Sequence, residues 1–249
     1  MDLQISDKSA LVTGGSSGLG LATAKALAAE GVKVAIASRS AEKLGRALAE
    51  LPPGSAAFQA DLSSPEGAGA LLEEVRQDFG SPDILVANAG GPRPGGYAAV
   101  TMDDYRAAIE QNLLSMIALC NGVVGEMRAR NFGRIIAITS LYVKQPSPDL
   151  ILSNTARTGL TAYLKTLAAE VAAYGVTVNS LLPGLHRTER LVQLSGEDAQ
   201  ARAEAFVPAK ALGDPESFGR VAAFVASRHA WYMTGQSLAI NGGAVRSLL

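Results

Sequence analysis

Cysteine is almost absent from this chain of 249 residues: the only one is Cys120, so no internal disulfide can form. Histidine is nearly as rare, and two distant histidines with one cysteine make no set of metal ligands. We therefore expect no metal site. Cys120 lies inside an apolar helical pattern, which favours a small buried side chain over a nucleophile.

A strong net charge and a long apolar run are also missing. With 22 basic and 23 acidic residues the formal net charge is −1, and no block of Lys and Arg could follow a nucleic-acid backbone. No uninterrupted apolar stretch approaches the ~20 residues of a membrane helix, and residues 1–10 lack the features of a secretory signal. These absences predict a cytoplasmic protein without a nucleic-acid or membrane partner, folded as one domain over residues 1–249.

Short apolar runs alternate with longer helical patterns along the whole chain. Most of these runs are apolar without alternation, as in strands that are covered on both faces of a parallel sheet. The repeated strand–helix order predicts a Rossmann-type doubly wound α/β sheet of about seven strands with helices on both faces. The predicted strands are Lys8–Thr13, Val32–Ala37, Ala56–Ala60, Asp83–Ala87, Arg134–Thr139, Val176–Leu182 and Ser237–Ile240. The predicted helices are Gly18–Glu30, Ala41–Leu51, Pro65–Phe79, Met102–Arg130, Leu152–Tyr174, Asp198–Phe206 and Pro215–Ser227.

The segment Thr13–Gly20 (TGGSSGLG) joins the first predicted strand to the first predicted helix. Glycines here let the backbone turn sharply and approach a pyrophosphate, and the helix N-terminus offers unpaired N–H groups and a positive dipole end. A glycine triplet alone also fits an ordinary turn, but the strand–turn–helix setting favours a dinucleotide site. The residues expected to contact the cofactor here are Gly14, Ser16, Ser17, Gly18, Leu19 and Gly20.

The end of the second predicted strand discriminates between the two nicotinamide cofactors. An acidic residue there would accept hydrogen bonds from the ribose 2'-hydroxyl and repel a 2'-phosphate. This chain has Ser38 and Arg39 instead; Ser38 removes the repulsion, and the planar guanidinium of Arg39 can pair with a phosphate. Arg39 could also be a solvated surface residue. The pattern favours NADP(H) over NAD(H).

The motifs of this chain, and their order along it, resemble those of the short-chain dehydrogenase/reductase family over essentially the whole chain. The loop TGGSSGLG is similar to the family's TGxxxGxG loop. The resemblance implies that Asp61 and Leu62 contact adenine, that Asn88-Ala89-Gly90 line the cofactor cleft, that Asn112 holds a proton-relay water, that Ser140 is catalytic, and that Pro183-Gly184 with Thr188 contact the nicotinamide amide.

Two positions depart from the family's pattern. The family has a Tyr thirteen residues after the catalytic Ser and a Lys four residues further on. Counting from Ser140 gives Ser153 and Arg157. Residues four apart share a helix face, so both side chains are expected to point at the nicotinamide cleft. A Ser hydroxyl is a far weaker acid than a Tyr, and Arg157 can bind the ribose but will not give up its proton.

Substitutes for the missing acid lie in the loop that leaves the fifth predicted strand. Tyr142 and Lys144 follow Ser140 by two and four residues, and loops at the carboxyl ends of parallel strands line the ligand crevice. We hypothesise that one of them supplies the proton, through Ser140 or water. The alternative is a contact at the rim of the cleft for Tyr142 and a solvated Lys144.

The leading interpretation is an NADP(H)-dependent reductase or dehydrogenase acting on a small carbonyl/alcohol pair, similar to 3-oxoacyl-acyl-carrier-protein reductases. Loss of the usual Tyr and Lys motivates a second interpretation, a non-catalytic protein that binds the dinucleotide as a structural or regulatory ligand. A cofactor-using enzyme of another reaction type is a third. The polar segment Gly184–Arg202 is expected to form a lid over the substrate, in which His186 could face the substrate or simply be packed. The family resemblance implies a homotetramer or homodimer.

Overall fold

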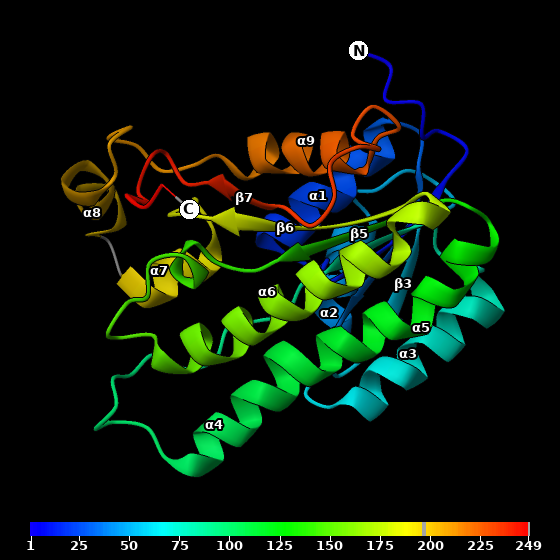
Figure 1. Cartoon of the computed structure of the whole chain (residues 1–249). Helices are drawn as coiled ribbons and strands as arrows, with labels where there is room; N and C mark the ends of the chain where they lie inside the picture. Colours follow the sequence, from blue (N-terminus) through cyan, green and yellow to red (C-terminus); the bar gives the residue numbers. More distant parts are fainter. Residues whose placement is uncertain (196–197, 249) are drawn as a thin grey trace.

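The computed structural model describes residues 1–195 and 198–248, and within them a seven-stranded parallel sheet forms the centre (Figure 1). The strands follow the order β3-β2-β1-β4-β5-β6-β7 across the sheet. This arrangement confirms the predicted Rossmann-type doubly wound fold. The strands are β1 (Ser9–Thr13), β2 (Lys33–Ser38), β3 (Ala56–Gln59), β4 (Ile84–Ala87), β5 (Gly133–Ile138), β6 (Val176–Pro183) and β7 (Ser237–Ile240).

Helices cover both faces of the sheet (Figure 1). One face packs against α3 (Pro65–Asp78), α5 (Ser115–Ala129) and α6 (Ile151–Val171), and the other against α1 (Gly18–Ala29), α2 (Ala41–Leu48) and α9 (Pro215–Ala226). Neighbouring residues of one strand serve opposite faces: Leu11 of β1 lies in the first core and Val12 in the second. Burial on both sides explains why these strands read as unbroken apolar runs.

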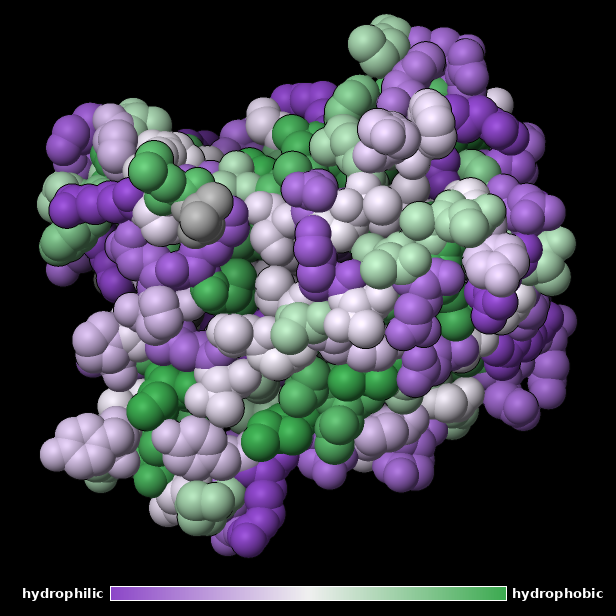
Figure 2. Space-filling view, viewed as in Figure 1, coloured by the Kyte–Doolittle hydropathy of each residue, from purple (hydrophilic) through white to green (hydrophobic). Residues whose placement is uncertain are grey.

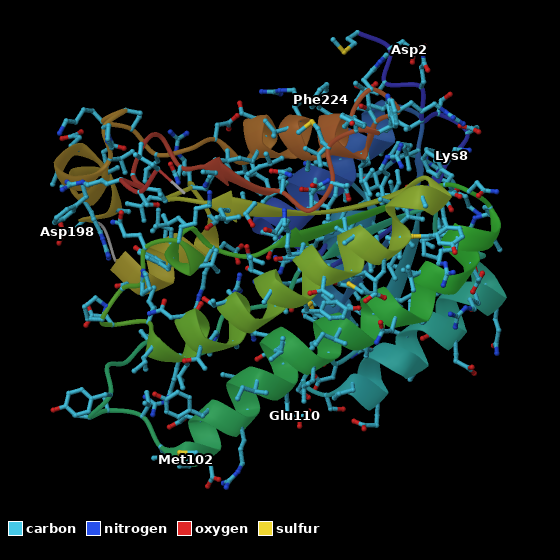
Figure 3. The ribbon with its side chains drawn as sticks, in the orientation of Figure 1. Asp2, Lys8, Met102, Glu110, Asp198 and Phe224 are labelled. Atoms are coloured by element: carbon cyan, nitrogen blue, oxygen red, sulfur yellow. The ribbon has the colours of Figure 1, made fainter. Side chains whose placement is uncertain are left out.

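The strand order reverses beside β1, which pairs with β2 on one side and with β4 on the other. The connections after β1 and β4 therefore leave toward opposite faces of the sheet and open a crevice at the carboxyl ends of the strands, which is where open α/β sheets bind ligands. The short helices α7 (Glu189–Ser195) and α8 (Ala199–Phe206) lie beyond these ends, and Asp198, just before α8, is at the outer edge of the molecule (Figure 3).

The predicted elements match the observed ones to within three residues at their ends, with two differences. The predicted helix Met102–Arg130 consists of α4 (Met102–Ile109), a π-helical turn (Glu110–Leu114) and α5; Met102 and Glu110 mark the starts of the first two in Figure 3. The segment Gly184–Arg202, expected to form a lid, contains α7, which is not among the predicted helices, while its residues 196–197 lie outside the described ranges.

Taken together, α4, the π-helical turn and α5 form the one helix among the described residues that is long and apolar enough to cross a membrane by length and composition. The sequence expectation concerned an uninterrupted apolar run, and polar side chains do interrupt the apolar pattern of these 28 residues. Core helices of globular proteins pass the same test. Here Met116, Leu119 and Met127 are buried in the core that α5 shares with α3 and α6.

Candidate active site

A cleft of about 690 Å³ lies at the carboxyl ends of the strands, where the topology places a ligand crevice. Nearly all the residues singled out from the sequence line it. They are Gly14, Ser16, Ser17, Gly18, Leu19, Ser38, Arg39, Asp61, Leu62, Asn88, Ala89, Gly90, Ser140, Tyr142, Ser153, Arg157, Pro183, Gly184 and Thr188. Of the other candidates, Gly20, Asn112 and Lys144 are not among the lining residues.

The glycine loop between β1 and α1 is held by the neighbouring strand end. The Thr13 hydroxyl donates to the Asn88 carbonyl at 2.8 Å and accepts from the Asn88 N–H at 2.9 Å, which joins the ends of β1 and β4. Gly14 follows with φ +58°, a backbone conformation that few other residues adopt. Ser17, at the N-cap of α1, makes no side-chain cap bond. The first turn of α1 therefore presents its unpaired N–H groups where an anion can bind.

The end of the cleft that is expected to receive the adenosine half of the cofactor (the adenosine end) combines a basic residue with an unpartnered hydroxyl. Ser38, Arg39 and Lys43 line this end, and the buried Ser38 Oγ has no protein hydrogen-bond partner. Asp61 also lines the cleft, and its carboxylate accepts from the Ser63 N–H at 3.1 Å. A buried hydroxyl that has no hydrogen-bond partner lowers the stability of a protein. Ser38 therefore fits a ligand that carries hydrogen-bond acceptors.

Arg157 occupies the base of the other end of the cleft. Its guanidinium donates to the carbonyls of Ile138 at 3.2 Å, Ala89 at 3.2 Å and Thr139, and thus bridges the ends of β5 and β4. Burial, with a smaller contribution from the charge of Arg190, lowers the pKa of Arg157 to about 10. The group therefore remains a cation at neutral pH, and its buried Nε has no protein partner.

Ser140, Tyr142 and Ser153 line the cleft at the same end as Arg157. The Ser140 Oγ accepts from the Tyr142 N–H at 3.2 Å, which fixes the single helical turn Leu141–Val143 and brings Tyr142 to the cleft. Lys144, the other hypothesised proton donor, does not line the cleft. Tyr142 is therefore the better-placed acid of the two.

Asn112 lies in the π-helical turn and is 2% exposed, with both amide atoms buried and without a protein hydrogen-bond partner. Its neighbour Gln111 lines the cleft instead. Ser115, one turn further along, has a buried hydroxyl that is also unpartnered. Buried polar atoms of this kind are usually satisfied by enclosed water, which is the role expected of Asn112 from the sequence. That role stays a prediction.

The segment expected to form a lid begins where β6 ends. His186 is 5% exposed and packs edge-on against the Phe218 ring with 5.2 Å between centroids, and burial lowers its pKa. The ring also touches the cleft, but these contacts favour the packed alternative for His186. Beyond it, Arg190 donates to the Pro92 carbonyl at 3.0 Å, so α7 reaches the opposite wall of the cleft.

Among the polar lining residues, Lys43, Gln111 and Glu189 were not singled out from the sequence. A signal existed only for Lys43, because a cation in the first turn of a helix opposes the helix dipole. Glu189 and Arg190 follow Thr188 directly, yet their position depends on α7, which the sequence pattern did not indicate. No group of three or more His, Cys, Asp or Glu side chains in the described ranges could hold a metal ion.

A bidentate ion pair fixes the irregular loop at residues 90–96 to α4. Arg93 donates to both carboxylate oxygens of Asp104, at 2.9 and 2.6 Å, while Asp104 completes the capping box with Thr101. The Arg93 guanidinium and the Thr101 hydrogen bonds hold the pKa of Asp104 well below its usual range. Because the folded-state pKa is lowered, this stabilisation is present at neutral pH and is lost as the pH falls below about 4.

Asp104→Asn is therefore expected to lower the melting temperature at pH 7, and the difference from wild type should shrink toward pH 3. Asp103→Asn is the matched control, since Asp103 pairs with Arg106 on the surface of the same helix. Thermal melts across this pH range measure both variants. An equal, pH-independent effect of the two substitutions would show that the Arg93–Asp104 pair does not stabilise this region.

The fold and the cleft define a Rossmann-type α/β protein, and comparisons with known proteins narrow the class. The sequence matches the family model described as enoyl-(acyl carrier protein) reductase over residues 14–245. It is 37% identical over 237 residues to the 3-oxoacyl-(acyl-carrier-protein) reductase of Escherichia coli K12, covering 95% of this chain and 96% of that protein. The chain belongs to the short-chain dehydrogenase/reductase family.

Solved structures agree with this assignment. L-sorbose reductase from Gluconobacter frateurii, complexed with NADPH and L-sorbose, has a TM-score of 0.93 at 32% identity and covers 100% of both chains. An NADPH-bound short-chain oxidoreductase from Pseudomonas aeruginosa PAO1, which contains an atypical catalytic center, has a TM-score of 0.88 at 30% identity over 97% of this chain and 98% of that one.

Proposed function

We propose that this protein is an NADP(H)-dependent oxidoreductase that interconverts a small-molecule carbonyl compound and its alcohol. The observation that carries the proposal is the continuity of one cleft, which runs from Ser38 and Arg39 past the glycine loop to Ser140 and Arg157. A 3-oxoacyl-(acyl-carrier-protein) reductase and an NADPH-bound L-sorbose reductase among its relatives support the same reaction class.

The residues present fit NADP(H). The unpartnered Ser38 Oγ and the exposed guanidinium of Arg39 suit a 2'-phosphate, and the first turn of α1 suits the pyrophosphate. Asp61 and Leu62 would hold the adenine, while Arg157, whose Nε lacks a protein partner, would bind the ribose beside the nicotinamide. When bound, NADPH supplies the hydride that a carbonyl carbon receives.

Reduction also needs a proton at the carbonyl oxygen, and the chain must provide it without the usual Tyr and Lys. Arg157 keeps its proton at neutral pH, so it can orient and stabilise but not act as the acid. Ser153 has a hydroxyl far too weak in acidity for this task. We infer that Ser140 binds the substrate oxygen and that Tyr142, which lines the cleft beside it, supplies the proton directly or through water.

Tyr142→Phe tests this assignment. If Tyr142 is the acid, kcat for carbonyl reduction should fall roughly 100-fold or more, while NADPH affinity stays unchanged. Tyr232→Phe is the control, because Tyr232 is 85% exposed and lies outside the cleft. Steady-state NADPH oxidation with a panel that includes a 3-oxoacyl thioester and a ketose measures both. Full turnover by Tyr142→Phe would exclude Tyr142 as the proton donor.

A second candidate function is a non-catalytic dinucleotide-binding protein with a structural or regulatory role. The observation that favours it is the pair Ser153 and Arg157 at the two positions where the family's acid and its partner are expected. In that case NADPH would bind, but no carbonyl compound in the panel would accelerate its oxidation above the rate in buffer.

We further propose that the protein acts as one domain over residues 1–249 in a cytoplasmic homodimer or homotetramer. Figure 2 shows apolar side chains gathered on the face where the helix formed by α4 and α5 passes, and Leu114 on this helix is 36% exposed. The exposed side chains of Trp231 and Tyr232 give a second apolar surface. Light scattering tests the proposed assembly, which a monomeric mass would contradict.

A further inference from the structure

One ion pair crosses the mouth of the cleft. Lys43 Nζ lies 2.7 Å from Glu189 Oε2, and the two residues are 146 positions apart in the sequence. Lys43 belongs to the first turn of α2 at the adenosine end, and Glu189 is the first residue of α7 in the lid. Both side chains line the cleft. The pair therefore ties the lid to the wall that would receive the adenosine half of a cofactor.

The position of Lys43 is unfavourable for a structural cation. It is the third residue of α2, where its own N–H donates to the Ser40 hydroxyl at 3.2 Å, and the dipole at this end of a helix favours anions. Next to it lie the exposed guanidinium of Arg39 and the buried, unpartnered Ser38 Oγ. Three groups on one short segment thus offer hydrogen-bond donors or positive charge to the same part of the cleft.

Glu189 is a replaceable partner for Lys43. The side chains of the pair are 39% and 66% exposed, and ion pairs with this exposure contribute little to protein stability. A phosphate monoester carries close to two negative charges at neutral pH and has three acceptor oxygens. A phosphate bound beside Arg39 would therefore compete well for Lys43, and it would repel the Glu189 carboxylate.

The lid has a second tether on the opposite wall, where Arg190 donates to the Pro92 carbonyl at 3.0 Å. Consecutive residues of α7 thus hold the two sides of the cleft, Glu189 through Lys43 and Arg190 through the loop that contains Pro92. Loss of the first contact would free α7 from α2, while α7 remains attached to the loop that contains Pro92.

We propose that Lys43 is a second cation for the 2'-phosphate of NADP(H), and that this phosphate displaces Glu189 from Lys43 and so releases the α2 tether of the lid. The inference rests on the proposed NADP(H) dependence. Lys43 then contributes to the selectivity for NADP(H) over NAD(H), and Glu189 is a counter-ion that the phosphate replaces when the cofactor binds. NADH, which lacks the phosphate, leaves the pair and the tether in place.

Calorimetric titration with NADPH and NADH separates these roles. Lys43→Gln should weaken NADPH binding about tenfold and leave NADH binding unchanged, as expected for the loss of one charge-assisted contact. Glu189→Gln should tighten NADPH binding several-fold, because Lys43 is then free, again without effect on NADH. Arg46→Gln is the matched control: Arg46 lies on the same helix, pairs with Glu42 at 3.4 Å and does not line the cleft.

Amide hydrogen exchange over residues 189–195 gives a readout that does not depend on activity. In the wild type, exchange here should be faster in the NADPH complex than in the NADH complex. In Glu189→Gln the two complexes should exchange alike.

Equal weakening of both cofactors by Lys43→Gln, or no change in either, would overturn the inference while leaving the proposed function intact. The same holds if Glu189→Gln binds NADPH no more tightly than the wild type does. A wild-type protein that binds neither nucleotide would overturn the proposed function, and this inference with it.

Discussion

Gly20→Ala is expected to weaken NADPH binding by at least 100-fold and to destabilise the protein by ~1–3 kcal/mol. A Cβ on Gly20 would clash with the Gly14 carbonyl oxygen and lie only 2.9 Å from the Gly14 carbonyl carbon. Both atoms are backbone, so neither can move aside without changing the turn that connects β1 to α1. The first turn of α1 would then leave the position in which its N–H groups can meet a pyrophosphate.

Gly69→Ala is the matched control for this substitution. Gly69 is an exposed glycine inside α3, and a Cβ there would have no neighbour within 4 Å. Alanine favours a helix over glycine, so this variant should gain ~0.5–1 kcal/mol of stability and bind NADPH as the wild type does. Denaturant unfolding and fluorescence titration measure both quantities. Near-normal NADPH affinity in Gly20→Ala would mean that the glycine loop does not form the phosphate site.

The second large effect is expected for Arg157→Met, which should cost ~2–3 kcal/mol of stability and weaken NADPH binding about tenfold. The guanidinium of Arg157 satisfies the carbonyls of Ile138, Thr139 and Ala89 at the base of the cleft. A methionine side chain would fill much of the space but leave these acceptors without donors. The ends of β4 and β5 would lose their common anchor, and the ribose would lose a cationic donor.

Arg134→Met provides a matched control at the other end of β5. Arg134 is 2% exposed and donates to three carbonyls, those of Ser227, Gly133 and Gly175, and burial lowers its pKa to about 10. It does not line the cleft. Its loss should therefore cost similar stability but leave NADPH affinity unchanged. If both variants bound NADPH as tightly as the wild type, Arg157 would have a purely structural role.

Most of the fold could be predicted because its signals are local. The strands are buried on both faces, so runs such as Val34–Ala37 and Ile84–Ala87 stand out as uninterrupted apolar segments between helical patterns. The π-helical turn Glu110–Leu114 was not predicted, since one additional residue in a helical turn does not disturb the apolar pattern enough to be noticed. Helix α7 was missed because it is short and largely polar.

Much of the cleft lining could also be predicted, because most candidates lie at or just after a strand end that the parallel topology brings to one edge. Contacts between distant segments could not. Spacing alone placed Arg157 on the helix face toward the cleft, but its three carbonyl partners depend on the packing of α6 against two strand ends. The Lys43–Glu189 pair likewise depends on where α7 docks. Such contacts carry no sequence pattern.

Arg157 differs in its chemistry from the lysine that the family usually has at this position. A lysine can lower the pKa of a neighbouring tyrosine and exchange protons, whereas Arg157 is engaged by three carbonyls and stays protonated. Under the proposed function, the proton comes instead from the wall formed by Ser140 and Tyr142. In this proposal the cofactor is bound as the family resemblance implies, but the proton-donating residue lies in the loop after β5 and not on α6.

Transfer of a labelled hydride tests the central claim most directly. NADPH that carries deuterium at both positions of the nicotinamide C4 is incubated with the wild-type protein and each carbonyl compound of the panel, and the alcohol product is analysed by mass spectrometry. The account predicts an alcohol with one deuterium on its carbinol carbon and loss of that product in Gly20→Ala. Tight binding of the labelled NADPH with no deuterated alcohol from any compound would contradict it.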